Sequence, residues 1–224
     1  MLELDRGLPP RGVRLGWAAA AGVGLGAGLG AASFCADRID GMPRLLLQFV
    51  ASTGFAWGCA AFIAAFPART RAGAVTAAVA VLCTATVCYY ALNVRGDALV
   101  PVLLALAYWL LPSVAGGAAL GVLAHMVRTD RPPSAAVAAG LACGLLAGAG
   151  ADIVIALLAA GDHGPARLAD GILQVVASVA VTTWLFGRRR GPQPWLRFAA
   201  TAVAACAAST LAWSAVESVQ VIGF

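Results

Sequence analysis

The sequence predicts an all-α, polytopic membrane helix bundle with seven transmembrane helices. Of its 224 residues, 61% are hydrophobic and 11% are charged, whereas soluble domains carry about 25% charged residues. Apolar segments recur along the whole chain, and each is long enough to cross a bilayer, which takes roughly 20 residues. Short Arg-, Pro- and Gly-bearing connections separate them. We therefore expect residues 1–224 to form a single integral-membrane helical domain.

The seven helices are predicted at residues 15–34, 45–66, 72–93, 99–126, 134–160, 168–187 and 197–221. The first follows an Arg-rich start, as in a signal peptide, but its apolar run is long enough to span, so we expect it to be retained. In the fourth, Pro101 falls in the first turn, where proline is tolerated. Pro112 falls in the middle and predicts a kink, which can open a cavity around Tyr108 and Trp109.

Glycines spaced four residues apart predict where helices pack closely. Such spacing places them on one helix face, where missing side chains let backbones approach. The series are Gly22, Gly26 and Gly30 in the first segment, Gly117 and Gly121 in the fourth, and Gly140, Gly144 and Gly148 in the fifth. In the fifth segment the next position on this stripe is Asp152, which is therefore expected to face a neighbouring helix or an internal cavity.

The arginines predict the orientation, because cytoplasmic loops carry an excess of basic residues. All 15 basic residues are Arg. With the N-terminus inside and the C-terminus outside, the inner arginines outnumber the outer ones, which are Arg38, Arg44, Arg95 and Arg167. The Lys-free, Ala- and Gly-rich composition is typical of GC-rich genomes such as those of actinobacteria, so we expect the bacterial cytoplasmic membrane.

Two carboxylates inside apolar segments are the candidate catalytic residues. Asp152 has no charged residue within nine positions on either side, and a charged Asp at the centre of a spanning helix costs about 2.5–3.5 kcal/mol. It could be a hydrogen-bonded structural group, a proton donor or acceptor in a pocket, or a partner of an Arg or a cation. Glu217 lies in the last segment, where it could share a cavity with Asp152 or sit at the membrane interface.

Aromatic and amide side chains supply the candidate substrate-binding residues. Trp57, Trp109 and Trp213 map inside apolar segments, away from the interfacial belts where membrane tryptophans usually lie. They could simply pack in the bundle, or they could line a pocket with faces that stabilise a cation by roughly 0.5–2 kcal/mol each. The full candidate set is Trp57, Tyr89, Tyr90, Trp109, Trp213, Gln48 and Asn93.

Other patterns narrow the classes of function. The pair Asp37 and Asp40 could share a divalent ion with a pyrophosphate or form a plain surface cluster with Arg38, and the outer arginines could hold an anionic head group. The sequence has only two His and no paired His–Cys ligand set, so no metal is expected. A P-loop and a dinucleotide motif are also missing, so no cofactor is expected. The net charge of +5 comes from loop arginines that set topology, so no nucleic acid is expected.

Two resemblances accompany these patterns. The stretch from Phe55 to Phe62, followed by an Arg-bearing turn and the Tyr89–Tyr90 pair, resembles an uncharacterised family of actinobacterial multi-pass proteins and implies no function. Its size, seven helices and two intramembrane acids are similar to those of integral-membrane terpene cyclases. That similarity implies a lyase- or isomerase-type cyclisation in terpenoid biosynthesis, in which Asp152 protonates a lipophilic prenylated substrate and Glu217 accepts a proton.

An alternative from another class remains open. Polar side chains gather toward the predicted outer side, which suits a small-molecule transporter or a substrate-capture subunit with an outward-facing site. The glycine face of the first helix could dock a partner membrane subunit. In either class the expected partners are a lipophilic small molecule and the membrane lipids.

Overall fold

The computed structural model describes residues 11–39, 49, 54–94, 99–160, 164–188 and 194–223, with the backbone alone at 11–15 and 216–223. Within these ranges every regular element is a helix and no strand occurs, which confirms the all-α prediction. The helices are α1 (Arg11–Ala36), α3 (Gly54–Ala65), α4 (Arg71–Asn93), α5 (Leu99–Thr129), α6 (Pro132–Ala160), α7 (Pro165–Gly187) and α8 (Trp195–Gly223).

Six of these helices are long and apolar enough to cross a membrane. The exception is α3, which has 12 residues and covers only the second half of the predicted segment 45–66. Large apolar side chains are exposed on the outer surfaces of the long helices; Leu111 is 76% exposed and Leu196 is 84% exposed. Such surfaces suit contact with lipid, so the chain is a multi-pass membrane protein by the length, composition and surface of its helices.

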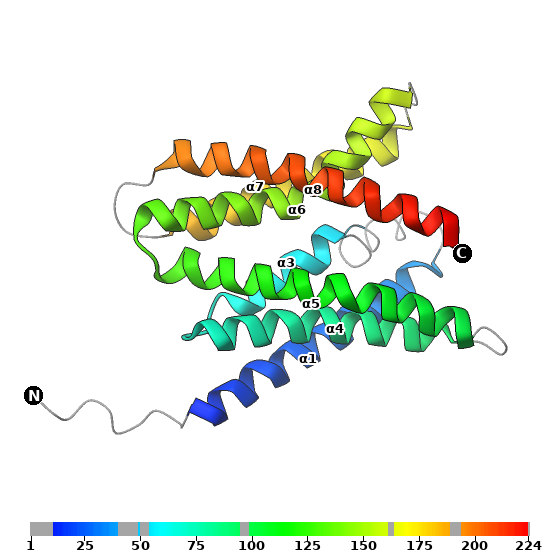
Figure 1. Cartoon of the computed structure of the whole chain (residues 1–224), viewed down its shortest axis with the longest axis horizontal. Coiled ribbons are helices and arrows are strands. Elements are labelled where there is room, and N and C mark those ends of the chain that lie inside the picture. Colours follow the sequence, from blue (N-terminus) through cyan, green and yellow to red (C-terminus); the bar gives the residue numbers. More distant parts are fainter. Residues whose placement is uncertain are drawn as a thin grey trace, which may run out of the picture.

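The helices form two groups. On one side α4 packs against both α1 and α5, and on the other α6 packs against both α7 and α8. Figure 1 shows α3 between the two groups, where it contacts α4, α5 and α6. The buried core centres on α3, whose Phe62 is fully buried, together with Val81, Val127 and Phe186.

Glycine seams join the helices as the sequence predicts. A Cβ added at Gly22 of α1 would lie 2.7 Å from the Ala77 carbonyl oxygen of α4. At Gly144 of α6 it would lie 2.5 Å from the Ala202 carbonyl oxygen of α8. Both distances are below van der Waals contact, so only glycine permits these backbone approaches.

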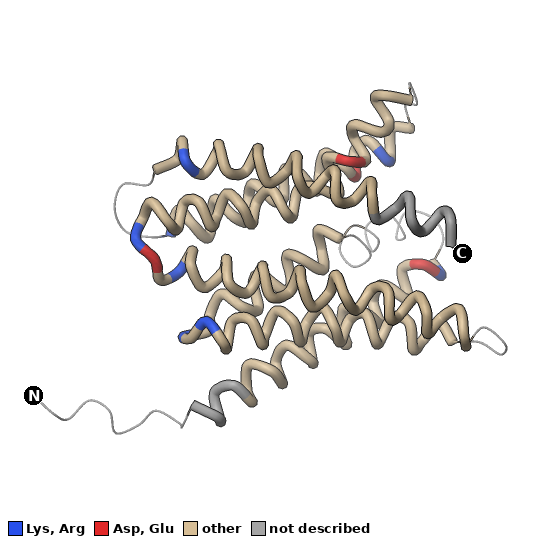
Figure 2. Tube along the Cα trace, in the orientation of Figure 1, with Lys and Arg blue, Asp and Glu red and all other residues tan. Residues whose placement is uncertain are grey.

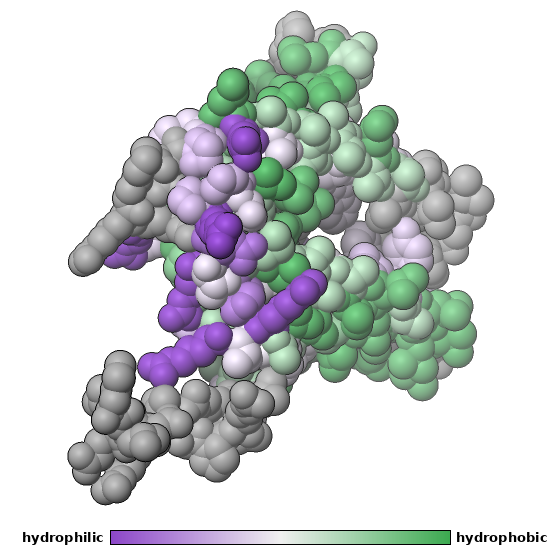
Figure 3. Space-filling model, turned by 60° about the vertical axis from the view of Figure 1, so that its left-hand side comes forward, coloured by the Kyte–Doolittle hydropathy of each residue, from purple (hydrophilic) through white to green (hydrophobic). Residues whose placement is uncertain are grey.

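Charged side chains separate the two ends of the bundle (Figure 2). We call one the Arg-rich end, where α3, α5 and α7 end and α4, α6 and α8 begin. Its described arginines are Arg69, Arg71, Arg128, Arg131, Arg188 and Arg197. Figure 3 shows hydrophilic side chains gathered there. The opposite, Arg-poor end carries Arg38 after α1 and Arg167 in the first turn of α7 among the described residues.

Arg128 ties the Arg-rich end together. Its Nη1 donates to the carbonyl oxygens of Phe66, Pro67 and Ala68, which follow α3. These carbonyls would otherwise lack partners at a helix C-terminus, where a cation is also favourable. The charge of α5 is thereby used to close the turn between α3 and α4.

Candidate functional site

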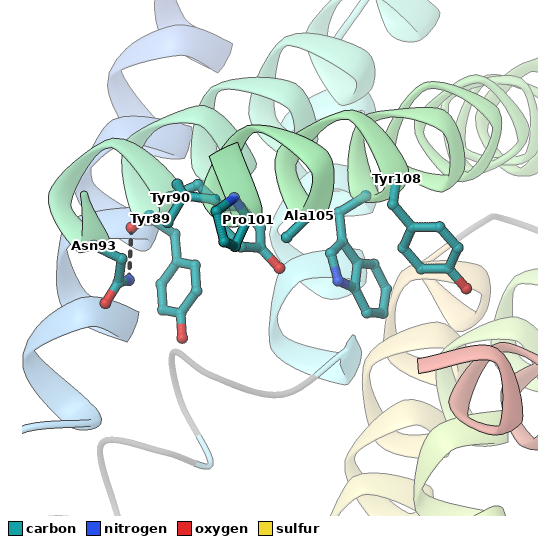
Figure 4. A pocket seen from close by; sticks show the side chains of 8 residues that line it. Tyr89, Tyr90, Asn93, Pro101, Ala105 and Tyr108 are labelled. Atoms are coloured by element: carbon teal, nitrogen blue, oxygen red, sulfur yellow. Dashed lines mark hydrogen bonds between the residues drawn. The ribbon is translucent and has the colours of Figure 1, made fainter. Parts of the chain in front are cut away.

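A pocket of about 440 Å³ lies at the Arg-poor end, between the last turns of α4 and the first turns of α5. Ligand pockets in proteins usually measure about 300–1,000 Å³. Its lining consists of aromatic and small apolar side chains with one amide: Tyr89, Tyr90, Asn93, Pro101, Val102, Ala105, Tyr108 and Trp109. In Figure 4 the labelled side chains extend to the same side of α4 and α5. We call this the aromatic pocket.

The aromatic pocket exists because the close packing of α4 and α5 stops halfway along the pair. At the Arg-rich half, Gly117 and Gly121 of α5 lie against the backbone of Val79 and Val75. Toward the Arg-poor end the glycines are replaced by large rings. Tyr108 and Trp109 meet edge to face with centroids 5.5 Å apart, and such rings hold the helices apart.

Two hydroxyl groups mark the inner limit of the pocket. The buried Thr86 and Ser113 oxygens are 2.8 Å apart and bridge α4 to α5. The Ser113 hydroxyl also lies 2.7 Å from the Trp109 carbonyl oxygen, which anchors the helix turn that carries Trp109. Beside them, Pro112 removes the N–H that would have bonded the Tyr108 carbonyl. α5 continues through Pro112 as a helix.

The end of α1 supports the pocket from behind. The Tyr89 phenol donates to Asp37 Oδ2 at 2.7 Å, and Arg38 Nη2 donates to Asn93 Oδ1 at 3.1 Å. The Asn93 amide in turn donates to the Tyr89 carbonyl oxygen at 2.8 Å. Two pocket residues are therefore held in place by an adjacent acid and base, Asp37 and Arg38.

Trp57 belongs to the same aromatic assembly without lining the pocket. Its indole N–H donates to the Ser33 hydroxyl of α1 at 3.1 Å. Its ring meets Tyr89 edge to face with centroids 6.4 Å apart. Trp57 thus connects α3 to α1 and braces Tyr89 on the side away from α5.

Trp213 brings α8 to the pocket. Its ring centroid lies 6.2 Å from that of Trp109, and a Cβ added at Gly54 of α3 would lie 2.7 Å from the Trp213 ring. Five of the predicted binding residues therefore form one connected assembly: Trp57, Tyr89, Tyr90, Trp109 and Trp213, with Asn93 beside them.

The remaining predicted site residues lie elsewhere or outside the described residues. Asp152 is half-buried on α6 and does not line the aromatic pocket. Its glycine stripe packs against α8 as predicted, with Gly148 beside Ser209. The side chain of Glu217 and all of Gln48 are outside the part of the chain that the structure describes. A shared cavity for Asp152 and Glu217 thus stays a prediction.

Sequence reasoning overlooked a buried polar stripe on α7. Gln174, Ser178 and Thr182 are each at most 1% exposed, and they share one face at four-residue spacing. Gln174 Nε2 donates to Asp170 Oδ2 at 2.9 Å, whereas the two hydroxyls bond carbonyls of their own helix. The four-residue spacing of polar types was the available signal. Because the hydroxyls are satisfied within α7, they serve packing.

The comparisons with family models, with curated proteins and with solved structures found no match to this chain. The site must therefore be interpreted from its own chemistry. Apolar walls with a few convergent polar groups are typical of small-molecule sites. Within the described ranges, no group of three His, Cys, Asp or Glu side chains could hold a metal ion.

Proposed function

We propose that this protein is a membrane-embedded small-molecule-binding protein, either a substrate-capture subunit or a transporter, whose lipophilic ligand occupies the aromatic pocket. The observation that carries the proposal is the lining itself. Pro101, Val102 and Ala105 offer an apolar wall, and the rings of Tyr108 and Trp109 extend it. Asn93 is the single amide. A ligand with a long apolar body and one polar end matches this division.

The rings are suited to binding because their positions are already set. Tyr89 is held by Asp37 and by the edge of Trp57, and Trp109 is held by Trp213. Binding then costs little ordering of side chains, which otherwise takes about 0.5–1.5 kcal/mol for each immobilised residue. A preorganised aromatic surface is therefore a better explanation of these contacts than packing alone.

The pocket is expected to face the outside of the cell. The described arginines concentrate at the opposite end of the bundle, and the positive-inside rule places that end in the cytoplasm. Cys35, which is exposed near the end of α1, tests this orientation. A membrane-impermeant maleimide should label Cys35 in intact cells, and a Cys35→Ser variant should lose the label because Cys59 and Cys143 are buried. Labelling only after cell lysis would reverse the orientation.

The test of binding is to fill the pocket. Ala105 lines it, so Ala105→Trp should block the ligand while leaving the helix intact. The matched control is Ala107→Trp, because Ala107 is exposed on the same helix. Mass spectrometry of organic extracts from both purified variants and the wild type should show a lipophilic species that Ala105→Trp alone lacks. An identical set of molecules in all three samples would refute the proposal.

Acid-initiated cyclisation is the second candidate. The observation in its favour is Asp152, a half-buried carboxyl in a spanning helix for which the described residues supply no hydrogen bond. Because Asp152 is not part of the aromatic pocket, this chemistry would need a substrate that extends from the pocket toward α6. Asp152→Asn should then accumulate the uncyclised precursor in the same extracts. Unchanged extracts from a folded Asp152→Asn variant would exclude this candidate.

A further inference from the structure

Arg38 is placed to act on whatever occupies the aromatic pocket. It follows α1 at the Arg-poor end and is exposed. Its Nη2 donates to the side chain of Asn93 at 3.1 Å, and Asn93 is part of the pocket lining. The guanidinium group therefore lies one side chain away from the cavity.

The orientation of this guanidinium group is fixed from one side. Nη1 donates to the Phe34 carbonyl oxygen at 3.0 Å, and the central carbon lies 3.4 Å from the centroid of the Phe34 ring. An Arg side chain has five N–H donors, so the bonds to Phe34 and Asn93 leave several for another acceptor. Among the described residues no carboxylate pairs with Arg38; its neighbour Asp37 instead accepts from Tyr89.

We propose that the ligand is an amphiphile with an anionic head group, a phosphate or a carboxylate, which Arg38 binds while the apolar chain lies in the aromatic pocket. This inference rests on the proposed function. Planar guanidinium groups suit the two oxygens of such head groups, and the resulting charge-assisted hydrogen bonds are roughly twice as strong as neutral ones. Phe34 and Asn93 hold the group in advance, so little freedom is lost on binding.

Asp37 makes the inference testable with two substitutions of opposite effect. Its carboxylate is adjacent to Arg38 in the chain and repels an anionic head group. Asp37→Asn removes that charge, and its amide oxygen can still accept from Tyr89. Arg38→Gln removes the attraction. A merely structural role for the pair would make both substitutions act in the same direction.

The experiment measures fluorescence quenching by chains that carry a terminal bromine. Protein in phosphatidylcholine nanodiscs is titrated with bromododecyl phosphate, bromododecanol and bromododecyltrimethylammonium. Quenching of Trp109 is isolated by subtracting the signal of Trp109→Phe. The phosphate should bind about tenfold more tightly than the alcohol, the gain expected from a charge-assisted hydrogen bond. Arg38→Gln should remove this difference, and Asp37→Asn should enlarge it by a few fold.

The outcomes separate this inference from the function beneath it. If bromododecanol binds as tightly as the phosphate and Ala105→Trp abolishes both, the pocket stands and the anionic head group is refuted. If no probe quenches Trp109, or if Ala105→Trp changes nothing, the proposed function itself fails. Where the phosphate binds best, competition identifies the source: phosphatidylglycerol in the disc competes if the head group belongs to a membrane lipid. Competition by inorganic phosphate alone supports a phosphorylated compound free in solution.

Discussion

The α4–α5 pair and the α6–α8 pair show two ways for spanning helices to meet. Along α6, Gly140, Gly144 and Gly148 keep the backbone against α8 over three turns. Along α5, close contact is limited to Gly117 and Gly121, and rings take over beyond Ser113. The first pair is closed along its seam, whereas the second opens into the aromatic pocket. The difference indicates that small residues determine where this bundle is solid and that their absence determines where it can bind.

The largest expected effect is at the closed seam. Gly144→Ala places a Cβ 2.5 Å from the Ala202 carbonyl oxygen, from Ala205 Cβ and from the Cys206 nitrogen. Two of these three atoms are backbone and cannot turn aside, so α6 and α8 must separate. Overpacking of this kind costs about 1–3 kcal/mol, and we expect the upper part of that range. Thermal unfolding in one detergent, followed by circular dichroism, measures the loss.

The control for this substitution is Gly28→Ala on α1. An added Cβ there meets nothing within 4 Å, and Ala is the better helix former by about 0.8–1.0 kcal/mol in water. The unfolding temperature should therefore stay the same or rise. Equal losses in Gly28→Ala and Gly144→Ala would show that the glycine seam is not what holds α6 to α8.

Much of this contrast could be predicted from the sequence, because packing by glycine depends only on helical periodicity. The seams at Gly22 and Gly144 appear where the four-residue spacing places them. The aromatic assembly was predicted as a set of residues, but its geometry was not. Which ring meets which depends on the register between helices far apart in sequence, and α1 brings Asp37 and Arg38 to α4 only through the Gly22–Gly30 seam.

The acids were harder to place for the same reason. Asp152 is the least comfortable residue in a one-dimensional hydropathy pattern, which made it the first candidate. The structure puts it on the closed side of the molecule, on the glycine stripe that packs against α8. The acid that contacts pocket residues is Asp37, at the end of α1. A charge at a helix end looks ordinary in sequence, because interfacial charges are common and carry little cost.

An intermediate effect is expected where hydroxyl groups bridge helices. Thr86→Val keeps the shape of the side chain and removes the 2.8 Å contact with Ser113 that joins α4 to α5. Interhelical hydrogen bonds in membranes contribute about 0.6 kcal/mol on average and up to about 1.7 kcal/mol, so we expect a loss near 1 kcal/mol. Chemical unfolding in a fixed lipid–detergent mixture can resolve it. Because this bridge marks the inner limit of the pocket, ligand binding should weaken as well.

Ser178→Ala is the matched comparison for Thr86→Val. Ser178 is fully buried, but its hydroxyl bonds only the Gln174 carbonyl oxygen of its own helix. Bonds of this kind to the preceding turn do not stabilise a helix, so the loss should stay below about 0.5 kcal/mol. If Ser178→Ala costs as much as Thr86→Val, the α7 stripe joins helices and is more than internal packing.

The smallest net effect is expected at Gln174. Its side chain is 1% exposed; Nε2 bonds Asp170, and Oε1 is buried and has no hydrogen-bond partner. Gln174→Met keeps the length of the side chain, loses the bond to Asp170 and removes the unsatisfied oxygen. An unsatisfied buried group costs about 1–3 kcal/mol, and a hydrogen bond to a charged group gains about 1.5–3 kcal/mol. The two terms oppose each other, so the unfolding free energy should change by less than about 1 kcal/mol. A loss well above that value would mean that Oε1 bonds a water or an ion within the bundle, and the α6–α7 contact would then be a second site rather than a closed seam.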